Sequence, residues 1–408
     1  MRYSGWAIAA LMLSLAAGTA AAETEWPQGP AALSAEGAPD RTAPLTAEDP
    51  PDTATPDAPP SDAHGGLLPA PPRAAASGLL RPLEDGRTRR WSVHFANDLF
   101  SFADRDRDYT GGVTFGLTGD RAHDHPMSLA AALERVDRAT RFAAWRGDAA
   151  LEGEALEIGL LLFTPQDLSA ARPLPDDRPY ASLLYAASSE LALDTERGTA
   201  FQSSLSIGVL GLPIAEALQR SVHKLVGSTE PQGYSHQISD GGEPTFMYSV
   251  SRYRLLAQRS YRGRPYSLRF GAGASVGYLT EANLELTLRS DAAWWSSSAA
   301  TADYAGHPAI GGRPPLARRR PRFELEAGAK LHARVYNAFV EGQFRHSDVV
   351  YSSRELQPLL VDLWIGATSV FPRGFTVSYT IRHQTEEIDR GRGARSFAWG
   401  SIGIAQSF

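Results

Sequence analysis

The chain has 408 residues, a formal net charge of -6 at pH 7 and a sequence pI near 6.0. This negative long-range field, together with the lack of a basic stripe interleaved with aromatic residues, argues against nucleic acid as a partner. The sequence contains no cysteine, which excludes a disulfide framework, a thiolate metal site and attachment of a lipid through a thiol.

Residues 1–22 have the pattern of a secretory signal peptide. Arg2 supplies a basic start, an apolar stretch follows over Trp6–Ala17, and small residues end the segment at Ala20–Ala22. The alternative is a membrane anchor, but the apolar stretch is shorter than the roughly 20 residues that a spanning helix needs. We therefore expect export of the chain and cleavage after Ala22.

Residues 23–88 are dominated by Pro, Ala, Asp, Glu and Gly, as in the run Thr55–Pro60. Such a segment has too few large apolar groups to offset the entropy lost on ordering. The composition predicts a disordered or polyproline-like tether in the periplasm, with a small docking segment as the alternative. The remaining residues, 89–408, are expected to form one large domain.

Within 89–408 the strongest signal is an alternation of apolar with small or polar residues. It recurs in Trp91–Ala96, Val113–Thr118, Ser204–Val209 and Phe375–Thr380. This period of two is typical of β-strands, and the sequence lacks the apolar run of about 18 residues that a membrane-spanning helix requires. A soluble sandwich would turn the polar face to water, whereas a membrane barrel turns the apolar face to lipid.

The C-terminal segment favours the membrane barrel over the sandwich. Ser396–Phe408 is an amphipathic strand that stops at Phe408, and it resembles the signal read by the assembly machinery of bacterial outer-membrane barrels. Open strand edges in hydrocarbon would leave backbone groups unsatisfied, so the last strand must pair with the first. Aromatic residues near strand ends fit the same reading; they are Trp91, Tyr109, Tyr180, Trp364, Phe371 and Trp399.

The pattern predicts an all-β, twelve-stranded antiparallel transmembrane barrel in the bacterial outer membrane, since an even count is usual. The expected strands are 89–98, 110–119, 154–164, 180–193, 198–211, 244–257, 265–277, 279–290, 321–342, 358–371, 373–386 and 396–408. The ninth is taken as one long strand rather than two split at Ala333–Arg334. Segments 120–153 and 291–320 are then long periplasmic connections.

A short helix is expected in the outer loop after the fifth strand. Pro213 suits a helix start and Gly227 a helix end. Leu218, Val222 and Leu225 fall on one face, and Gln219 and His223 lie close together because they are four residues apart. From spacing alone, a solvated histidine on a loop helix is favoured over a functional one, because a lone histidine is common.

A second polar group lies at the ends of the first two strands. Asn97–Asp98 ends the first strand and Asp104–Gly112 begins the second, and pairing of the strands brings the two segments together. Amide, carboxylate, hydroxyl and backbone oxygens suit a hard cation such as Ca²⁺. An ordinary Asp-rich turn is the alternative.

These segments, in this order, resemble the lipid A 3'-O-deacylases of the Gram-negative outer membrane, a family of Ca²⁺-dependent twelve-stranded barrels. The resemblance rests on four places, which are Asn97–Asp98 with Asp108–Gly112, Asp177–Ser182, Gln219–Gly227 with Pro231–Gln237, and the final strand. Together they cover about 89–408. Two positions depart from the family pattern, with Ser182 in place of a glycine and Tyr234 in place of a tryptophan.

The resemblance implies an esterase that acts on lipid A, the membrane-embedded part of lipopolysaccharide, by a phospholipase-A2-like mechanism. His223 would activate water, and a bound Ca²⁺ would stabilise the oxyanion. The carried-over catalytic residues are His223, Asn97, Asp98, Thr110 and Gln219, and the carried-over Ca²⁺ ligands are Asn97, Asp98 and Glu230. The family pattern can be aligned here in two registers that differ by one residue, so Thr229 is the alternative to Glu230 at this position.

Two alternatives remain at this point. The barrel could be a non-catalytic narrow pore or scaffold with 212–243 as a plug, or it could use the same site on phospholipid of the outer membrane. Arg172 and Arg178 in the second outer loop could pair with lipid A phosphates, or they could be solvated surface charges.

Overall fold

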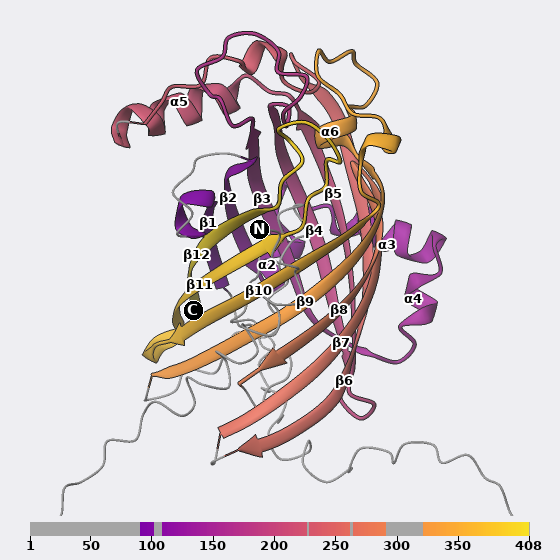
Figure 1. Cartoon of the computed structure of the whole chain (residues 1–408). Helices are drawn as coiled ribbons and strands as arrows, with labels where there is room; N and C mark the ends of the chain where they lie inside the picture. The colour runs from indigo at the N-terminus through magenta and orange to yellow at the C-terminus, as the bar shows by residue number, and fades with distance from the viewer. Residues whose placement is uncertain (1–89, 102–107, 227, 262–263, 291–320, 408) are drawn as a thin grey trace, which may run out of the picture.

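The computed structural model describes residues 90–101, 108–226, 228–261, 264–290 and 321–407 (Figure 1). Twelve antiparallel strands close into a barrel in sequence order. The strands are β1 (Arg90–Asn97), β2 (Asp108–Thr118), β3 (Ala150–Thr164), β4 (Ala181–Asp194), β5 (Thr199–Leu210), β6 (Glu243–Tyr261), β7 (Arg264–Gly277), β8 (Leu279–Arg289), β9 (Arg322–Asn337), β10 (Leu359–Val370), β11 (Phe375–Gln384) and β12 (Phe397–Ser407). Among the described residues, no helix is both long and apolar enough to span a membrane.

The barrel closes where the sequence predicts, between the first and last strands. β1 pairs antiparallel with β12, with Arg90 opposite Ser407 and Asn97 opposite Gly400. Closure gives every strand two partners, as a sheet in hydrocarbon requires. Phe408, the expected assembly signal, lies outside the described residues, as do the expected signal peptide and tether.

The alternation in the sequence separates the two faces of the barrel wall. Apolar side chains such as Phe95, Phe115 and Phe246 are exposed on the outside, where a membrane barrel meets lipid. The inside holds an aromatic-rich core that includes Tyr109, Phe163, Tyr278, Phe339 and Trp399. Buried ion pairs fill more of the interior; examples are Arg382–Asp362 at 2.6 Å, Arg269–Glu285 at 3.0 Å and Arg289–Glu324 at 3.2 Å.

The two ends of the barrel differ in their connections. At one end the turns 195–198 and 371–374 are short, the latter containing η4 (Pro372–Gly374). The other end carries longer loops, which hold η1 (Asp98–Ser101), α5 (Ile214–Val226), η2 (Tyr234–His236), α6 (Ala338–Glu341) and η3 (Ser353–Glu355). Because outer-membrane barrels have short periplasmic turns and longer outer loops, the α5 end is the extracellular end.

The ninth strand is shorter than expected. It continues through Ala333–Arg334 as predicted, but it ends at Asn337, where α6 begins. The side chain of Asn337 accepts a hydrogen bond from the Phe339 N–H, and Gly342 has a φ of 71°, which a larger residue adopts at a cost. Asn337 and Gly342 start and end a helical turn. The predicted end of the ninth strand at residue 342 was therefore wrong.

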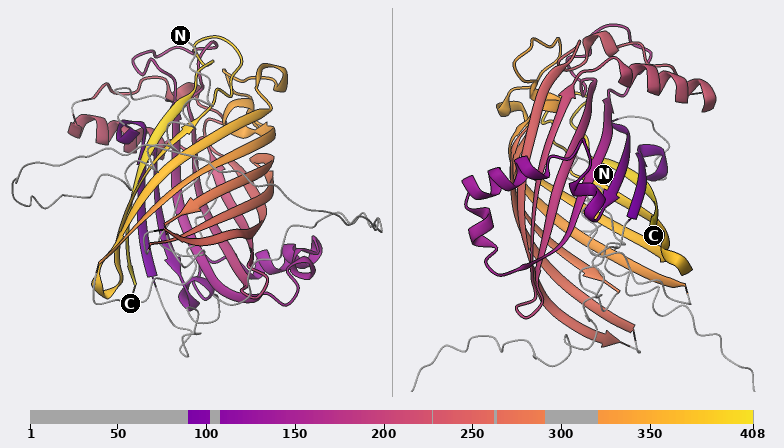
Figure 2. Two further views of the ribbon diagram at one scale, coloured as in Figure 1. Left: turned by 60° about the horizontal axis from the view of Figure 1, so that its bottom comes forward. Right: turned by 180° about the vertical axis from the view of Figure 1, so that it is seen from behind.

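The connection between β2 and β3 also differs from the expectation of a plain periplasmic loop. It contains α2 (Asp120–His123), α3 (Ala130–Ala139) and α4 (Phe142–Trp145), and β3 begins at Ala150 rather than 154. Figure 2 shows α3 and α4 beside the outer surface of the barrel. The other long connection, 291–320, lies outside the described residues.

Candidate functional site

The helix expected in the outer loop is present as α5, and it packs on the outside of the barrel. On β3, Leu161 and Phe163 belong to the interior core, whereas Leu160 and Leu162 form a separate cluster with Ala215 of α5. Successive side chains of a strand point to opposite faces, so this second cluster is on the outer surface. Figure 1 shows α5 reaching sideways at the extracellular end.

The face of α5 that meets the barrel carries both polar residues singled out in the sequence. Ala215, Gln219 and His223 are spaced four apart, and all three are buried. Leu218 and Ile214 are exposed, so apolar side chains of the helix face away from the protein at this rim. The side chains of Val222 and Leu225, which the sequence groups with Leu218, lie outside the described residues.

Two hydrogen bonds orient the imidazole of His223. Its Nδ1 lies 2.5 Å from the carbonyl oxygen of Thr229, and its Nε2 lies 3.3 Å from the side-chain nitrogen of Gln219. A carbonyl oxygen can only accept, so Nδ1 carries the proton and donates it to Thr229. Nε2 then holds the lone pair, which is the form that a general base needs.

Tyr234 extends this arrangement by one residue. Its hydroxyl donates to Oε1 of Gln219 at 2.7 Å, which turns the amide nitrogen of Gln219 toward Nε2 of His223. The Tyr234 ring is buried and lies 4.7 Å from the ring of Tyr180. The sequence marks Tyr234 only as a departure from a family pattern, because nothing in the local spacing shows which side chain its hydroxyl reaches.

The residues of the first hairpin also come together. The side-chain amide of Asn97 donates to the carbonyl of Thr110, and the hydroxyls of Thr110 and Thr164 form a hydrogen bond. Asp98 is buried at the start of η1. Val113, three residues after Thr110, packs against the outer cluster that holds Ala215, so the strand that carries Thr110 also contacts the cluster beneath α5.

The donor set at the hairpin suits a hard cation. Asn97 and Asp98 carry amide and carboxylate oxygens, the donor types that Ca²⁺ prefers. The described residues contain no cluster of three or more histidine or acidic side chains able to hold a metal, so further ligands would be backbone, hydroxyl or water oxygens. Glu230 fits less well, because it forms ion pairs with Arg220 at 3.7 Å and Lys224 at 3.9 Å.

Arg178 is neither a solvated surface charge nor available to a phosphate, so both expectations for it were wrong. Its side chain is 2% exposed, and its guanidinium lies 3.3 Å from Glu387 and 3.5 Å from Asp108. Arg395 bonds the same Asp108 at 2.8 Å and Asp177 at 2.7 Å. This buried network holds Asp108, two residues before Thr110, and so supports the hairpin from the interior side.

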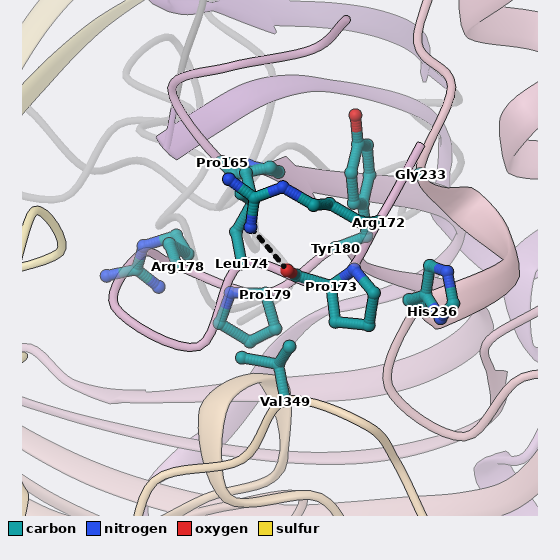
Figure 3. A pocket seen from close by; sticks show the side chains of 10 residues that line it. All are labelled: Pro165, Arg172, Pro173, Leu174, Arg178, Pro179, Tyr180, Gly233, His236 and Val349. Carbon is teal, nitrogen blue, oxygen red and sulfur yellow. Dashed lines mark hydrogen bonds between the residues drawn. The ribbon is translucent and has the colours of Figure 1, made fainter. Parts of the chain in front are cut away.

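A small pocket opens near the site on the extracellular end (Figure 3). Its lining includes Arg172, Tyr180, His236 and Val349. Arg172 is exposed, and its guanidinium donates to the neighbouring Pro173 carbonyl at 3.4 Å. Tyr180 also contacts Tyr234, whose hydroxyl bonds Gln219, so these two rings connect the pocket with the Gln219–His223 pair.

A closed barrel with an apolar outer wall and long loops at one end defines an outer-membrane β-barrel protein. The family model described as outer membrane protein LpxR matches residues 66–408. The chain therefore belongs to the LpxR family and is a protein of the bacterial outer membrane, which confirms the family predicted by resemblance.

A solved structure of the same family shares this fold. LpxR from Salmonella typhimurium is 15% identical, with a TM-score of 0.58 over 78% of this chain and 100% of that chain. The β domain of the Bordetella autotransporter BrkA is 10% identical, with a TM-score of 0.37 over 79% of this chain and 100% of that chain. At 15% identity the likeness to the Salmonella protein concerns the fold alone. A comparison with curated proteins finds no match.

Proposed function

We propose that the chain is a Ca²⁺-dependent esterase that removes 3'-linked acyl chains from lipid A in the outer leaflet. The observation that carries the proposal is the buried His223, whose Nδ1 donates to the Thr229 carbonyl, so that Nε2, which faces the Gln219 amide, carries the lone pair. Membership of the LpxR family supports an outer-membrane lipid as the substrate.

In the proposed reaction, Nε2 of His223 takes a proton from a water molecule as that water attacks the ester carbonyl. The hydrogen bond from Nδ1 to Thr229 stabilises the imidazolium that forms. His223 then returns the proton to the departing sugar oxygen. A Ca²⁺ ion held by Asn97 and Asp98 would supply positive charge for the developing oxyanion, with Thr110 orienting Asn97 through its backbone carbonyl.

The position of the site supports a membrane lipid over a soluble ester. The α5 residues Gln219 and His223 face the outer wall of the barrel, and Ile214 and Leu218 are exposed beside them. A lipid could therefore approach sideways within the membrane, with its acyl chains against apolar side chains and its ester near His223. Transfer of a long acyl chain through water would be costly, at about 0.8 kcal/mol per CH₂ group.

The same mechanism would serve a phospholipase, so lipid analysis must separate the two substrates. Lipid A and phospholipids would be extracted from cells that express the chain, and both would be analysed by mass spectrometry with fragmentation to locate the missing acyl group. We expect loss of the 3'-linked chains from lipid A and no change in the phospholipids. Lysophospholipid with intact lipid A would instead favour the phospholipase.

The matched variants are His223→Ala and His346→Ala. His346 is an exposed histidine of the same extracellular end, so it controls for the loss of an imidazole without touching the site. We expect His223→Ala to abolish deacylation and His346→Ala to retain it. We expect a chelator to abolish deacylation by the purified wild-type protein, and added Ca²⁺ to restore it. Full activity of His223→Ala would reject the proposed base.

A further inference from the structure

The connection between β2 and β3 starts and ends at the periplasmic end, yet it folds back along the outside of the barrel (Figures 1 and 2). We call residues Ala130–Trp145, which comprise α3 and α4, the α3–α4 bracket. It packs on β4 and β5, and Trp145 reaches Phe201 of β5 with ring centroids 5.5 Å apart. This element has no part in the proposed ester hydrolysis.

Specific hydrogen bonds attach the bracket to the wall. The buried carboxylate of Asp137 accepts from the hydroxyl of Ser203 at 2.7 Å and from that of Tyr248 at 2.7 Å. Just before α3, the Leu129 N–H donates to the hydroxyl of Ser188 at 2.8 Å. These residues come from β4, β5 and β6, so the bracket spans three strands and its position on the wall is well defined.

The bracket lies where exposed arginines interrupt the apolar surface of this sector of the wall. Toward the extracellular end, Ile207 and Phe246 are exposed to 49% and 53%, as expected for contact with hydrocarbon. Toward the periplasmic end, outward positions on the same strands include Ser203, Arg252 and Arg254, and both arginines are exposed, although Leu256 beyond them is exposed to 47%. The bracket therefore lies beside a cationic band of the wall, as expected for the level of the lipid headgroups.

The outward face of the bracket is cationic with apolar flanks. Arg135, Arg138 and Arg141 are exposed, and the acidic residues of Ala130–Trp145 are the buried Asp137 and Glu134, which pairs with Arg138 at 3.3 Å. Trp145 is 51% exposed at one end, and an amphipathic aromatic side chain of this kind is favoured at the membrane interface.

We propose that the α3–α4 bracket binds anionic phospholipid headgroups in the periplasmic leaflet of the outer membrane. The exposed arginines are complementary to phosphate, and the exposed Trp145 inserts at the acyl boundary beside them. A second copy of the same cationic surface would be repelled, so charge favours a lipid over self-association.

The absence of native cysteine permits a direct test. The full chain carrying Ala139→Cys, at an exposed position of α3, is labelled with a fluorophore and reconstituted into phosphatidylcholine vesicles. Trace quantities of headgroup-quencher lipid are then added, either as phosphatidylglycerol or as phosphatidylcholine. We expect phosphatidylglycerol to quench at a several-fold lower mole fraction, and we expect high salt to remove the difference.

Charge-removing variants complete the test. Arg135→Gln, Arg138→Gln and Arg141→Gln together should abolish the preference for phosphatidylglycerol. The matched triple variant Arg345→Gln, Arg354→Gln and Arg390→Gln, at the extracellular end, should keep it. Heat-dependent gel mobility checks that each barrel is folded. Equal quenching by both lipids, no quenching by either, or fluorophore self-quenching that rises with protein density would overturn the proposal.

Discussion

A single hydroxyl orients the proposed base of this protein. Tyr234 bonds the amide oxygen of Gln219, and the amide nitrogen of Gln219 faces Nε2 of His223. Without that hydroxyl the amide could rotate and present its oxygen, which cannot donate to a lone pair. Tyr234 is therefore a positioning residue, acting on the imidazole through Gln219.

We expect Tyr234→Phe to lower kcat about three- to tenfold with little change in KM, because a net hydrogen bond contributes about 0.5–1.5 kcal/mol. The measurement is steady-state hydrolysis of lipid A by purified protein. Tyr180→Phe is the control, since it removes the hydroxyl of the neighbouring ring, which contacts the Leu168 carbonyl at 3.4 Å. Equal losses in both variants, or a change confined to KM, would contradict the role of Tyr234.

At the scale of elements, α5 and α3 both lie on the outer wall of the barrel. α5 packs through Ala215 on the outer face of β3, and α3 is held by Asp137 on β5 and β6. The hydroxyl of an outward-facing serine on a membrane barrel finds no hydrogen-bond partner in the lipid hydrocarbon. Covering Ser188 and Ser203 with α3 satisfies those hydroxyls, so the helix and the wall stabilise one another.

Asp137→Ala is expected to release α3 while leaving the barrel folded. Loss of this carboxylate removes the acceptor of the buried Ser203 hydroxyl and the shorter hydrogen bond of the Tyr248 hydroxyl, which keeps the Thr140 hydroxyl at 3.1 Å. A buried donor left unsatisfied costs about 1–3 kcal/mol. Trypsin should then cleave after Arg135, Arg138 or Arg141 faster than in the wild type. Glu134→Ala, which removes an exposed carboxylate from the same helix, should leave the rate of trypsin cleavage unchanged. If Asp137→Ala resists trypsin as well as the wild type does, Asp137 does not anchor the helix.

At the scale of the whole molecule, the described part of the interior is closed by side chains. An aromatic-rich core lies toward the extracellular end, and buried ion pairs between neighbouring strands, such as Arg382–Asp362 and Arg289–Glu324, add further side chains to the interior. The network around Arg178 joins β9, the outer loops and the first hairpin. This filling argues against an open pore as the function of the barrel.

We therefore expect almost no ionic current from the purified protein in planar bilayers. An open porin inserted under the same conditions provides the positive control, and heat-dependent gel mobility confirms that the added protein is folded. Discrete conductance steps comparable with those of the porin would contradict a filled lumen. Such steps would favour the alternative function of a narrow pore, which the sequence alone leaves open.

Much of the architecture was predictable because it depends on local pattern. The seventh strand was expected at 265–277 and is Arg264–Gly277, and the loop helix expected within 211–227 is Ile214–Val226. Errors arose where a local signal was weak. The helical turn after Asn337 depends on one side-chain cap and one glycine, and the Ala-rich α3 carries no stronger cap, since the Leu129 side chain forms none.

The amino-acid sequence alone determined the alternation, the strand count and the pairing of the last strand with the first, because each follows from short-range periodicity and from the need to close a sheet in lipid. Only the tertiary structure decided the partners of the polar groups. Tyr234 reaches a residue 15 positions away, and Arg178 reaches one 209 positions away. Contacts across such distances depend on how the barrel and its loops pack, which no local pattern encodes.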